Sequence, residues 1–398
     1  MVSTNGPISV MMLGLRGFPY VQGGVEAHTE HLCSHLVALG CDVTVLVRSP
    51  SQRVEIGSVW KGVKFVALWA PRSSGLETVV HSFLGVLYAS IKRPDILHIQ
   101  AIGPALVVPL AKILGLRVVV THHGPDYDRE KWGLLARFIL KLGERWGMTW
   151  ANRRIVISKV ISDLVLAKYG EASVLIPNGV DLPQLPNSIE ALKQFDLTPG
   201  HYVLLVSRLV PEKRHLDLIA AFKRASLPDW KLVIIGDINH PDAYQREVMK
   251  YASEANVVIA GFQYGLALEE IYANAGLFVL PSSHEGLSIV LLEALSYGLK
   301  VIASDIPANL EVGLPVEHYF PLGDISVLAD LIRMLSGKTI ALKDQENTRA
   351  WVAQYYDWQD IAEKTLKLYE ELVKPINAIE ISIESDQKEE DNLLSMIK

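Results

Sequence analysis

The stretch Leu277-Phe-Val-Leu-Pro-Ser-Ser-His-Glu-Gly-Leu-Ser-Ile-Val-Leu-Leu-Glu293 contains one complete strand–turn–helix unit. Its first four residues are apolar, as in a strand that is buried on both faces of a sheet. The polar residues that follow predict a turn, and a helix is expected from about Leu287. A buried strand followed directly by a helix is the repeating unit of parallel α/β folds. We therefore expect this stretch to be one unit of a parallel sheet covered by helices.

Units of the same kind occupy most of the chain on both sides of this stretch. In the first half, strands are expected at Ile8–Leu13, Asp42–Val47, Lys64–Leu68, Ile96–Ile99, Arg117–Thr121, Arg154–Ile157 and Val174–Ile176. Helices are expected between them at Val25–Leu39, Leu76–Ile91, Pro104–Leu114, Leu134–Ala151 and Lys159–Tyr169. In the second half, further strands are expected at Tyr202–Ser207, Lys231–Ile235, Val257–Ala260 and Lys300–Ala303, with helices beginning near Pro211, Pro241, Leu266 and Asp324. The pattern predicts an α/β protein with two Rossmann-like halves.

A proline-rich segment separates the two halves. Four prolines between residues 177 and 199 interrupt the periodicity and predict a linker. The end of the chain carries six acidic residues against two lysines and has no sustained apolar face, which predicts disorder. The expected parts are a first domain (1–180), a linker (181–200), a second domain (201–355), a last helix (356–374) and a disordered acidic tail (375–398).

Composition and charge exclude several classes of protein. Hydrophobic residues make up 49% and charged residues 21% of the chain, as in ordinary globular proteins. The net charge is −6, without the basic footprint of a nucleic-acid-binding protein, so no nucleic-acid partner is expected. No uncharged apolar segment reaches the length of a membrane span, and no signal peptide precedes the first expected strand. With only two cysteines, the protein is expected in the cytoplasm.

The turn and helix start in the opening stretch could bind a phosphate group. The first amides of a helix are unpaired and carry partial positive charge, and Gly286 would allow a ligand close to the backbone. Glu285 precedes these amides, and Glu293 lies about two turns into the helix. A diphosphate there would have a carboxylate on each side, which suits a nucleotide sugar because carboxylates accept hydrogen bonds from hydroxyls. The alternative is an ordinary helix start with two glutamates.

Two cations follow the first strand of the second half. Arg208 stands at the end of that strand, and Lys213 is expected in the first turn of the helix that Pro211 opens. Cations oppose the helix dipole at this end, so their placement suits a diphosphate between them. We name Arg208 and Lys213 the diphosphate clamp. The alternative is ordinary surface charge, with Lys213 paired to Glu212.

Two loops of the first half could also contact a ligand. Gly14-Leu-Arg-Gly-Phe-Pro-Tyr-Val-Gln-Gly-Gly-Val-Glu26 is glycine-rich but lacks the G-x-G-x-x-G spacing of a dinucleotide site. Gly23 and Gly24 could admit a phosphate or a sugar, or form only a flexible loop. Thr121-His-His-Gly-Pro125 follows a strand at the sheet edge where α/β proteins bind ligands, although a histidine there is often structural.

Two further groups contain residue types that bind metals. Asp126 and Asp128 form a D-x-D pair, but an aspartate near a helix start more often caps the helix. His28, His31 and His35 share one helix face without the glutamate of a zinc-protease motif, and we expect them to form a polar flank. No metal site is predicted.

Taken in order along the chain, these motifs resemble those of the family-4 retaining glycosyltransferases, which have the GT-B fold of two facing Rossmann-like domains. The matching elements are Gly23-Gly-Val-Glu26, Thr121-His-His-Gly124, Ile176-Pro-Asn-Gly-Val-Asp181, Ser207-Arg208 with Lys213, and Glu285-x7-Glu293. Two further segments, Gly14-Leu-Arg-Gly-Phe-Pro19 and Lys131-Trp-Gly133, resemble a branch of the family that acts in bacterial surface-polysaccharide assembly.

The resemblance implies a role for each matched residue of the second half. Arg208 and Lys213 would bind the diphosphate of a nucleotide-sugar donor, and Glu293 would accept the ribose hydroxyls. Glu285 would lie beside the donor sugar as a catalytic carboxylate. The backbone amides of four residues would complete the donor site: Gly286, Leu287, Ser288 and Ile289.

The resemblance also implies roles for the first half and for the last helix. His123 would be the catalytic histidine that faces the transferred sugar, with His122 as the alternative. Gly23 and Gly24 would close on the donor, and the last helix would cross back onto the first domain.

The implied reaction transfers a sugar to a glycan or lipid-linked acceptor with retention of configuration, by attack on the same face of the sugar. No metal ion and no other cofactor is expected, because the clamp and the helix amides can stabilise the leaving diphosphate. A non-catalytic nucleotide-sugar-binding subunit and a nicotinamide-dependent oxidoreductase are the alternatives. The oxidoreductase would need the fingerprint that the glycine-rich loop lacks.

The segment from Arg129 to Arg154 predicts a possible contact with an anionic membrane, which would place the enzyme on the inner membrane face. It carries seven basic and two acidic residues together with several aromatic ones. Such a helix suits an anionic lipid surface. The alternative is an amphipathic helix that covers the sheet with its apolar face and exposes charges on the other.

Overall fold

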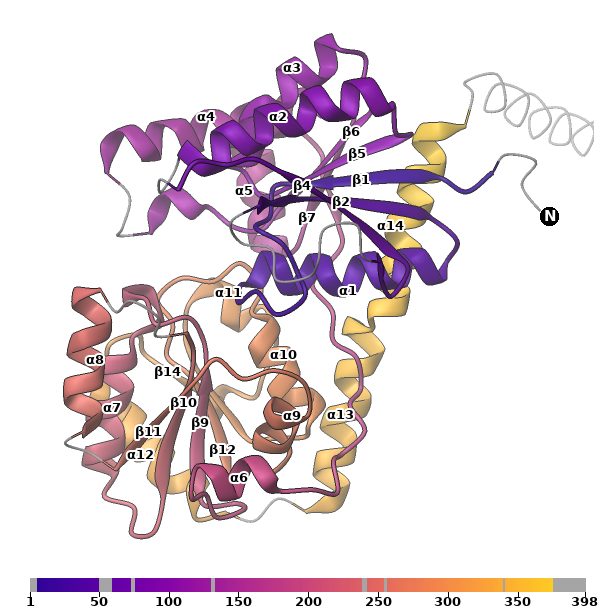
Figure 1. Cartoon of the computed structure of the whole chain (residues 1–398). Coiled ribbons are helices and arrows are strands. Elements are labelled where there is room, and N and C mark those ends of the chain that lie inside the picture. The colour runs from indigo at the N-terminus through magenta and orange to yellow at the C-terminus, as the bar shows by residue number, and fades with distance from the viewer. Residues whose placement is uncertain are drawn as a thin grey trace, which may run out of the picture.

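The computed structural model describes residues 6–49, 59–72, 76–129, 133–237, 242–253, 256–338 and 341–374. These residues form two domains, each built on a parallel sheet covered by helices, which lie one above the other in Figure 1. The predicted α/β fold with two Rossmann-like domains is confirmed. The predicted acidic tail, residues 375–398, lies outside the described residues. Within the described ranges, none of the helices has the length and apolarity needed to cross a membrane.

The first sheet has the strand order β3-β4-β2-β1-β5-β6-β7-β8, and each strand is parallel to its neighbours except β3. The strands are β1 (Ser9–Leu13), β2 (Asp42–Arg48), β3 (Val59–Trp60), β4 (Val63–Leu68), β5 (Ile96–Gln100), β6 (Val118–His122), β7 (Arg153–Val156) and β8 (Val174–Leu175). In the register of the central strand, Val10 of β1 lies opposite Val43 on one side and Ile96 on the other.

Helices cover both faces of the first sheet. They are α1 (Gly24–Ala38), α2 (Leu76–Lys92), η2 (Pro104–Val107), α3 (Val108–Ile113), η3 (Asp126–Asp128), α4 (Leu134–Trp150) and α5 (Lys159–Tyr169). Successive side chains of a strand point to opposite faces. Met11 and Leu13 of β1 therefore belong to the core beneath α2 and α4, whereas Val10 and Met12 pack on the side of α1. Figure 1 shows α2, α3 and α4 on one side of the sheet and α1 on the other.

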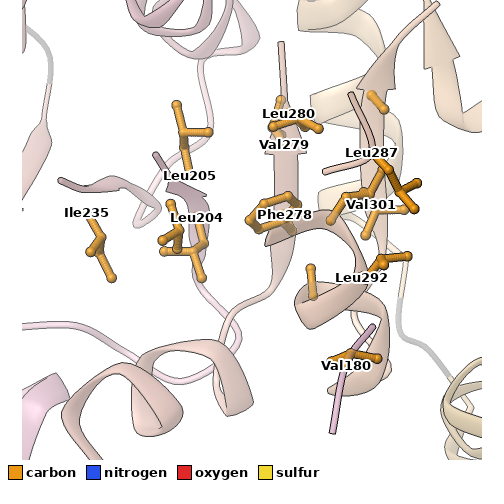
Figure 2. Packing of buried hydrophobic residues seen from close by; sticks show 14 of the residues in the cluster. Val180, Leu204, Leu205, Ile235, Phe278, Val279, Leu280, Leu287, Leu292 and Val301 are labelled. Carbon is orange, nitrogen blue, oxygen red and sulfur yellow. The ribbon is translucent and has the colours of Figure 1, made fainter. Parts of the chain in front are cut away.

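The second sheet has the order β11-β10-β9-β12-β13-β14, with every pair parallel. Its strands are β9 (Tyr202–Val206), β10 (Lys231–Ile235), β11 (Val257–Gly261), β12 (Leu277–Leu280), β13 (Val301–Ser304) and β14 (Tyr319–Phe320). Its helices include η4 (Pro211–Lys213), α7 (His215–Ala225), α8 (Ala243–Ser253), α9 (Gly265–Ala273), α10 (Ile289–Ser296), α11 (Pro307–Leu310), η5 (Val316–His318) and α12 (Ile325–Ser336). Figure 2 shows the core, where Leu204, Phe278 and Leu292 are completely buried.

Two segments run side by side between the domains. Val180 forms an isolated parallel bridge with Asp357, and the Val180 amide donates to the carbonyl oxygen of Tyr356 at 2.7 Å. Asp357 caps α14 (Trp358–Val373) by accepting a hydrogen bond from the amide of Gln359. Trp358 and Tyr369 of α14 are completely buried in the core on the α1 side of the first domain. The last helix therefore crosses back onto the first domain, as predicted.

Several elements were not predicted. The expected linker, residues 181–200, contains α6 (Glu190–Gln194), whose Ala191 and Leu192 are buried. Glu270 of α9 accepts a hydrogen bond from the Ala191 amide at 2.7 Å. A tertiary contact therefore stabilises this helix, although the prolines around it in the sequence predict a linker. The helix α13 (Leu342–Tyr356) is polar, and β3 and β14 have two residues each, so none of them produces a clear sequence period.

Candidate active site

Lys213 and Glu285 form an ion pair between two loops of the second domain. The Lys213 Nζ lies 2.5 Å from Glu285 Oε1, and only 14% and 10% of the two side chains are exposed. The alternative in which Lys213 pairs with the adjacent Glu212 is wrong. The amide of Ser283 donates to the Glu212 carbonyl at 2.9 Å, so the loop after β12 lies against η4 and brings Glu285 to Lys213.

Arg208 follows β9, is half-buried and interacts electrostatically with Glu212, the residue before Lys213. Within the described residues, the structure records no hydrogen bond or ion pair of its guanidinium group. Burial and the nearby Arg129 lower the pKa of Arg208, although an arginine remains charged at neutral pH. Its donors are therefore available to an anion.

The helix start that was predicted to bind phosphate lies where the two domains meet. The helix α10 begins at Ile289, two residues later than predicted, after Ser288 in an extended conformation. Within the described chain, the Ser288 hydroxyl does not cap the first amides of α10. The carbonyl oxygen of Leu287 accepts a hydrogen bond from Asn178 Nδ2 at 2.7 Å. A Cβ atom on Gly286 would overlap the carbonyl oxygen of His123 in the first domain.

Glu293 lies about one turn into α10, because that helix begins later than expected, and not two turns as predicted. Its Oε2 accepts a hydrogen bond from the buried Tyr272 hydroxyl at 2.8 Å. Burial raises the pKa of Glu293. The half-buried carboxylate still has acceptor capacity beyond Tyr272, as binding two neighbouring hydroxyls would require.

The two adjacent histidines at the end of β6 have different environments. His122 is completely buried, and its Nε2 lies 2.9 Å from Glu144 of α4. The Gly124 amide donates to His122 Nδ1, so Nε2 carries the proton and donates to Glu144. His123 is half-buried, with Nε2 2.8 Å from the Gln100 Oε1. His123 therefore lies at the domain contact, whereas His122 points into the first domain.

His123 is a neutral imidazole that packs against a second histidine. Burial and the neighbouring His122 lower the pKa of His123 to about 3. Its ring lies edge-on to that of His28, with 4.7 Å between the ring centroids. His28 Nδ1 lies 2.9 Å from Asn178 Oδ1, and Asn178 also donates to Leu287. This chain of contacts links α1 to the loop before α10.

The glycine-rich loop of the first domain contacts the second domain as well. Gly23 precedes α1, and a Cβ atom at this position would overlap the carboxylate of Glu26. That carboxylate pairs with Arg16 at 2.9 Å. Gln22 donates to the carbonyl oxygen of Ser207 at 3.1 Å and accepts from the Asp237 amide at 3.0 Å. Gly24 is exposed, with open space where a Cβ atom would lie.

Asp126 of the D-x-D pair and His31 and His35 of the histidine face have protein partners. Asp126 pairs with Arg129 at 2.7 Å. Asp181 lies 2.9 Å from His31 and 3.4 Å from His35. Across the described ranges, no cluster of three or more histidine, cysteine or acidic side chains is arranged to hold a metal ion.

Comparison with known proteins decides the family. The family model described as glycosyl transferases group 1 matches residues 190–333, and the model described as glycosyltransferase family 4 matches residues 22–184. The two matches cover most of the chain, including the site from Gly23 to Glu293. The chain consists of a glycosyltransferase family 4 domain followed by a glycosyl transferases group 1 domain. It is therefore an enzyme of the glycosyltransferase class with the GT-B fold, as the motifs predicted.

Named relatives agree with this assignment. A glycogen synthase of Mycobacterium tuberculosis is 25% identical over 395 residues, which cover 90% of this chain and 94% of the relative. The phosphatidylinositol N-acetylglucosaminyltransferase gpi3 subunit of Schizosaccharomyces pombe is 25% identical over 89% of this glycosyltransferase and 79% of its own length.

Solved structures share the fold of this glycosyltransferase at lower identity. Sucrose-phosphate synthase from Thermosynechococcus elongatus has a TM-score of 0.77 at 22% identity, covering 92% of this chain and 98% of that one. The Anabaena protein Alr3699/HepE in complex with UDP and glucose has a TM-score of 0.74 at 17% identity, covering 92% and 100% of the two chains.

Sequence reasoning about this glycosyltransferase missed several residues where the domains meet. Gln22 lies in the glycine-rich loop and Asn178 in the segment Ile176–Asp181, but only their contacts with the second domain single them out. In sequence Arg129 belongs to the basic segment that ends at Arg154, yet its Nε lies 3.9 Å from Glu212 of the second domain. No local signal identifies such residues, because their partners are far away in the sequence.

Proposed function

We propose that this glycosyltransferase transfers a sugar from a nucleoside-diphosphate sugar to a glycan or lipid-linked acceptor, with retention of configuration. The observation that carries the proposal is the Lys213–Glu285 ion pair, which lies just before the start of α10 in the loop that meets the first domain at Gly286. The Anabaena protein with the same fold was solved with UDP-glucose, which supports a donor of this class.

The proposed chemistry depends on stabilising the leaving diphosphate. Arg208 has donors available, and the amides that begin α10 add partial positive charge. Lys213 would exchange its bond to Glu285 for one to the diphosphate. Its ammonium group ends a flexible side chain, so it can turn from one acceptor to another. Positive charge then accumulates where negative charge develops as the bond from sugar to phosphate breaks.

The remaining matched residues would hold the two sugars of the donor. Glu285 would face the transferred sugar once Lys213 moves to the diphosphate. There its carboxylate would stabilise positive charge on the sugar, and the proposal needs no covalent bond between the two. The neutral His123 donates to Gln100 through Nε2, so its Nδ1 is an acceptor for a sugar hydroxyl. Glu293 would accept from the ribose hydroxyls, and the loop with Gly23 and Gly24 would close on the donor. Gly24 leaves room for the donor, because a Cβ atom there would meet open space.

A thermal-shift screen of nucleoside diphosphates and their sugars tests this function. We expect a rise in the unfolding temperature with one nucleotide sugar, and release of the nucleoside diphosphate when an acceptor is added. Stabilisation without any release would indicate a non-catalytic binding subunit. Binding of NADH in a spectral titration, with no response to nucleotide sugars, would contradict the proposal and favour an oxidoreductase.

We further propose that α4 contacts the anionic inner face of the cytoplasmic membrane, where a lipid-linked acceptor would lie. Leu134, Leu135 and Phe138 have exposed fractions of 87%, 73% and 63%. Lys141 and Arg145 are exposed on the same helix. Lipid-facing apolar side chains beside cations suit an anionic bilayer surface.

Fewer basic residues of the segment from Arg129 to Arg154 are available for a membrane contact than the sequence indicated. Glu130, Lys131 and Trp132 lie outside the described residues. Arg129 lies at the domain contact, and Arg154 pairs with Glu171 at 2.9 Å. Sedimentation with vesicles of increasing anionic lipid content tests the contact, and charge reversal at Lys141 and Arg145 should abolish it. No sedimentation at low salt would contradict it.

A further inference from the structure

The carboxylate of Glu212 is a buried anion whose environment is incomplete. Its side chain is 5% exposed and lies between Arg208 and Lys213 in the sequence. Both carboxylate oxygens are buried, and neither has a hydrogen-bond partner within the described chain. A buried carboxylate without hydrogen bonds is costly, so such a group needs cations close to it.

The nearest recorded cation comes from the other domain. Arg129 follows η3 in the first domain, and its Nε lies 3.9 Å from Glu212 Oε1, beyond hydrogen-bonding distance. Asp126 holds another nitrogen of the same guanidinium at 2.7 Å and so fixes its orientation. The Arg129 Nε is buried and has no hydrogen-bond partner among the described residues. One donor of Arg129 thus lies close to Glu212, which stands between the two clamp residues in the sequence, and has no hydrogen-bond partner in the described part of the chain.

Arg129 also acts on the clamp itself. Among the charged groups that influence Arg208, Arg129 has the largest effect, and it lowers the pKa of Arg208 as a neighbouring like charge does. Two guanidinium groups near one another, each with donors unused, form an arrangement that an anion between them would stabilise.

We propose that Arg129 is a third cation of the donor-diphosphate site, supplied by the first domain to the clamp of the second. The inference rests on the proposed role of Arg208 and Lys213, and it adds a residue that the family motifs do not include. Because Arg129 and the clamp belong to different domains, the diphosphate would bind to both and hold the domains together. Glu212 would keep the three cations close to one another before the donor binds.

Isothermal titration of purified full-length variants tests the proposal. The probes are UDP, ADP and GDP, of which the one that binds wild type is carried forward together with its nucleoside. We expect Arg129→Ala to weaken diphosphate binding about 10- to 100-fold and to leave nucleoside binding unchanged, as for the loss of one hydrogen bond between charged groups. Arg129→Lys should restore part of the loss, because it keeps the charge without the planar group.

Arg117→Ala is the matched control, since Arg117 is an exposed arginine of the same domain. Arg208→Ala distinguishes a failure of the diphosphate clamp from a failure of the proposed role of Arg129. If Arg208→Ala loses diphosphate binding and Arg129→Ala does not, the third cation is refuted and the clamp stands. If neither variant loses binding, the proposed diphosphate site itself is wrong. If Arg129→Ala raises only the KM of the acceptor, Arg129 belongs to the acceptor site and the inference is overturned.

Discussion

Gly286 of the second domain lies against the carbonyl oxygen of His123 of the first, so closely that a Cβ atom on Gly286 would overlap that oxygen. The same Cβ atom would lie 3.1 Å from Ile157 Cδ1. At this point the two domains meet almost backbone to backbone, between the loop that carries His123 and the loop that carries Glu285. Any side chain at position 286 must therefore move the domains apart or displace one of these loops.

Gly286→Ala should reduce activity much more than stability. The added methyl group overlaps a backbone oxygen, which cannot rotate away as a flexible side chain can, so the arrangement of His123 against the second domain is lost. We expect kcat/KM to fall at least about tenfold, because displacing a catalytic group by about 1 Å can cost about 100-fold in rate. Gly133→Ala is the control, because a Cβ atom there meets open space. Equal activity of both variants would show that the contact is not required.

Removing either cation of the clamp should weaken use of the donor. For Arg208→Ala and Lys213→Ala we expect the donor KM to rise about 10- to 100-fold or kcat to fall comparably, because each loses charge-assisted hydrogen bonds to the diphosphate. Steady-state kinetics with varied donor measure this. Lys223→Ala, an exposed lysine of α7, should behave as wild type. Wild-type kinetics in both clamp variants would refute the assignment of the site.

Activity should persist in excess EDTA. The proposed site neutralises the diphosphate with side-chain cations and helix amides, so removing divalent metal leaves that charge in place. Turnover is measured before and after chelation and again with added Mg²⁺ or Mn²⁺. If EDTA abolishes turnover and either ion restores it, the carboxylates of Asp126 and Asp128 become the first ligands to test.

Glu144 should contribute stability that depends on pH. Burial opposes its ionisation, but hydrogen bonds from His122 and Tyr169 outweigh burial and lower the pKa of Glu144 to about 2. A lowered carboxyl pKa contributes stability that is complete above the unfolded value, about 4.5, and is lost as pH falls towards 2. The free energy of unfolding should therefore decrease more steeply between pH 5 and pH 3 in wild type than in Glu144→Gln.

At neutral pH, the stability of Glu144→Gln measures how much the buried contacts of Glu144 contribute to folding. Glu144→Gln leaves His122 and Lys168 without their anion, so we expect unfolding to become easier by about 3 kcal/mol. Denaturant titrations of both proteins give this difference, and Glu190→Gln, at an exposed pair with Lys193, is the control. An unchanged free energy of unfolding would mean that the buried network is not coupled to folding.

The sequence by itself determined the elements and the places where chemistry could occur. Apolar runs such as Leu277–Leu280 and Lys231–Ile235 coincide with β12 and β10, because burial on both faces leaves a continuous local pattern. Ligand-binding loops of parallel sheets follow their strands, so Arg208 and His123 could be singled out from their positions after β9 and at the end of β6.

Only the tertiary structure decided which of these residues meet. Lys213 pairs with Glu285, 72 positions away, and not with its neighbour Glu212, because a backbone hydrogen bond joins the two loops. His122 and His123 are alike in sequence, yet one faces Glu144 and the other faces the second domain. Arg129 approaches Glu212 only where the two domains meet. Such contacts depend on packing between distant segments, which leaves no period and no spacing in the sequence.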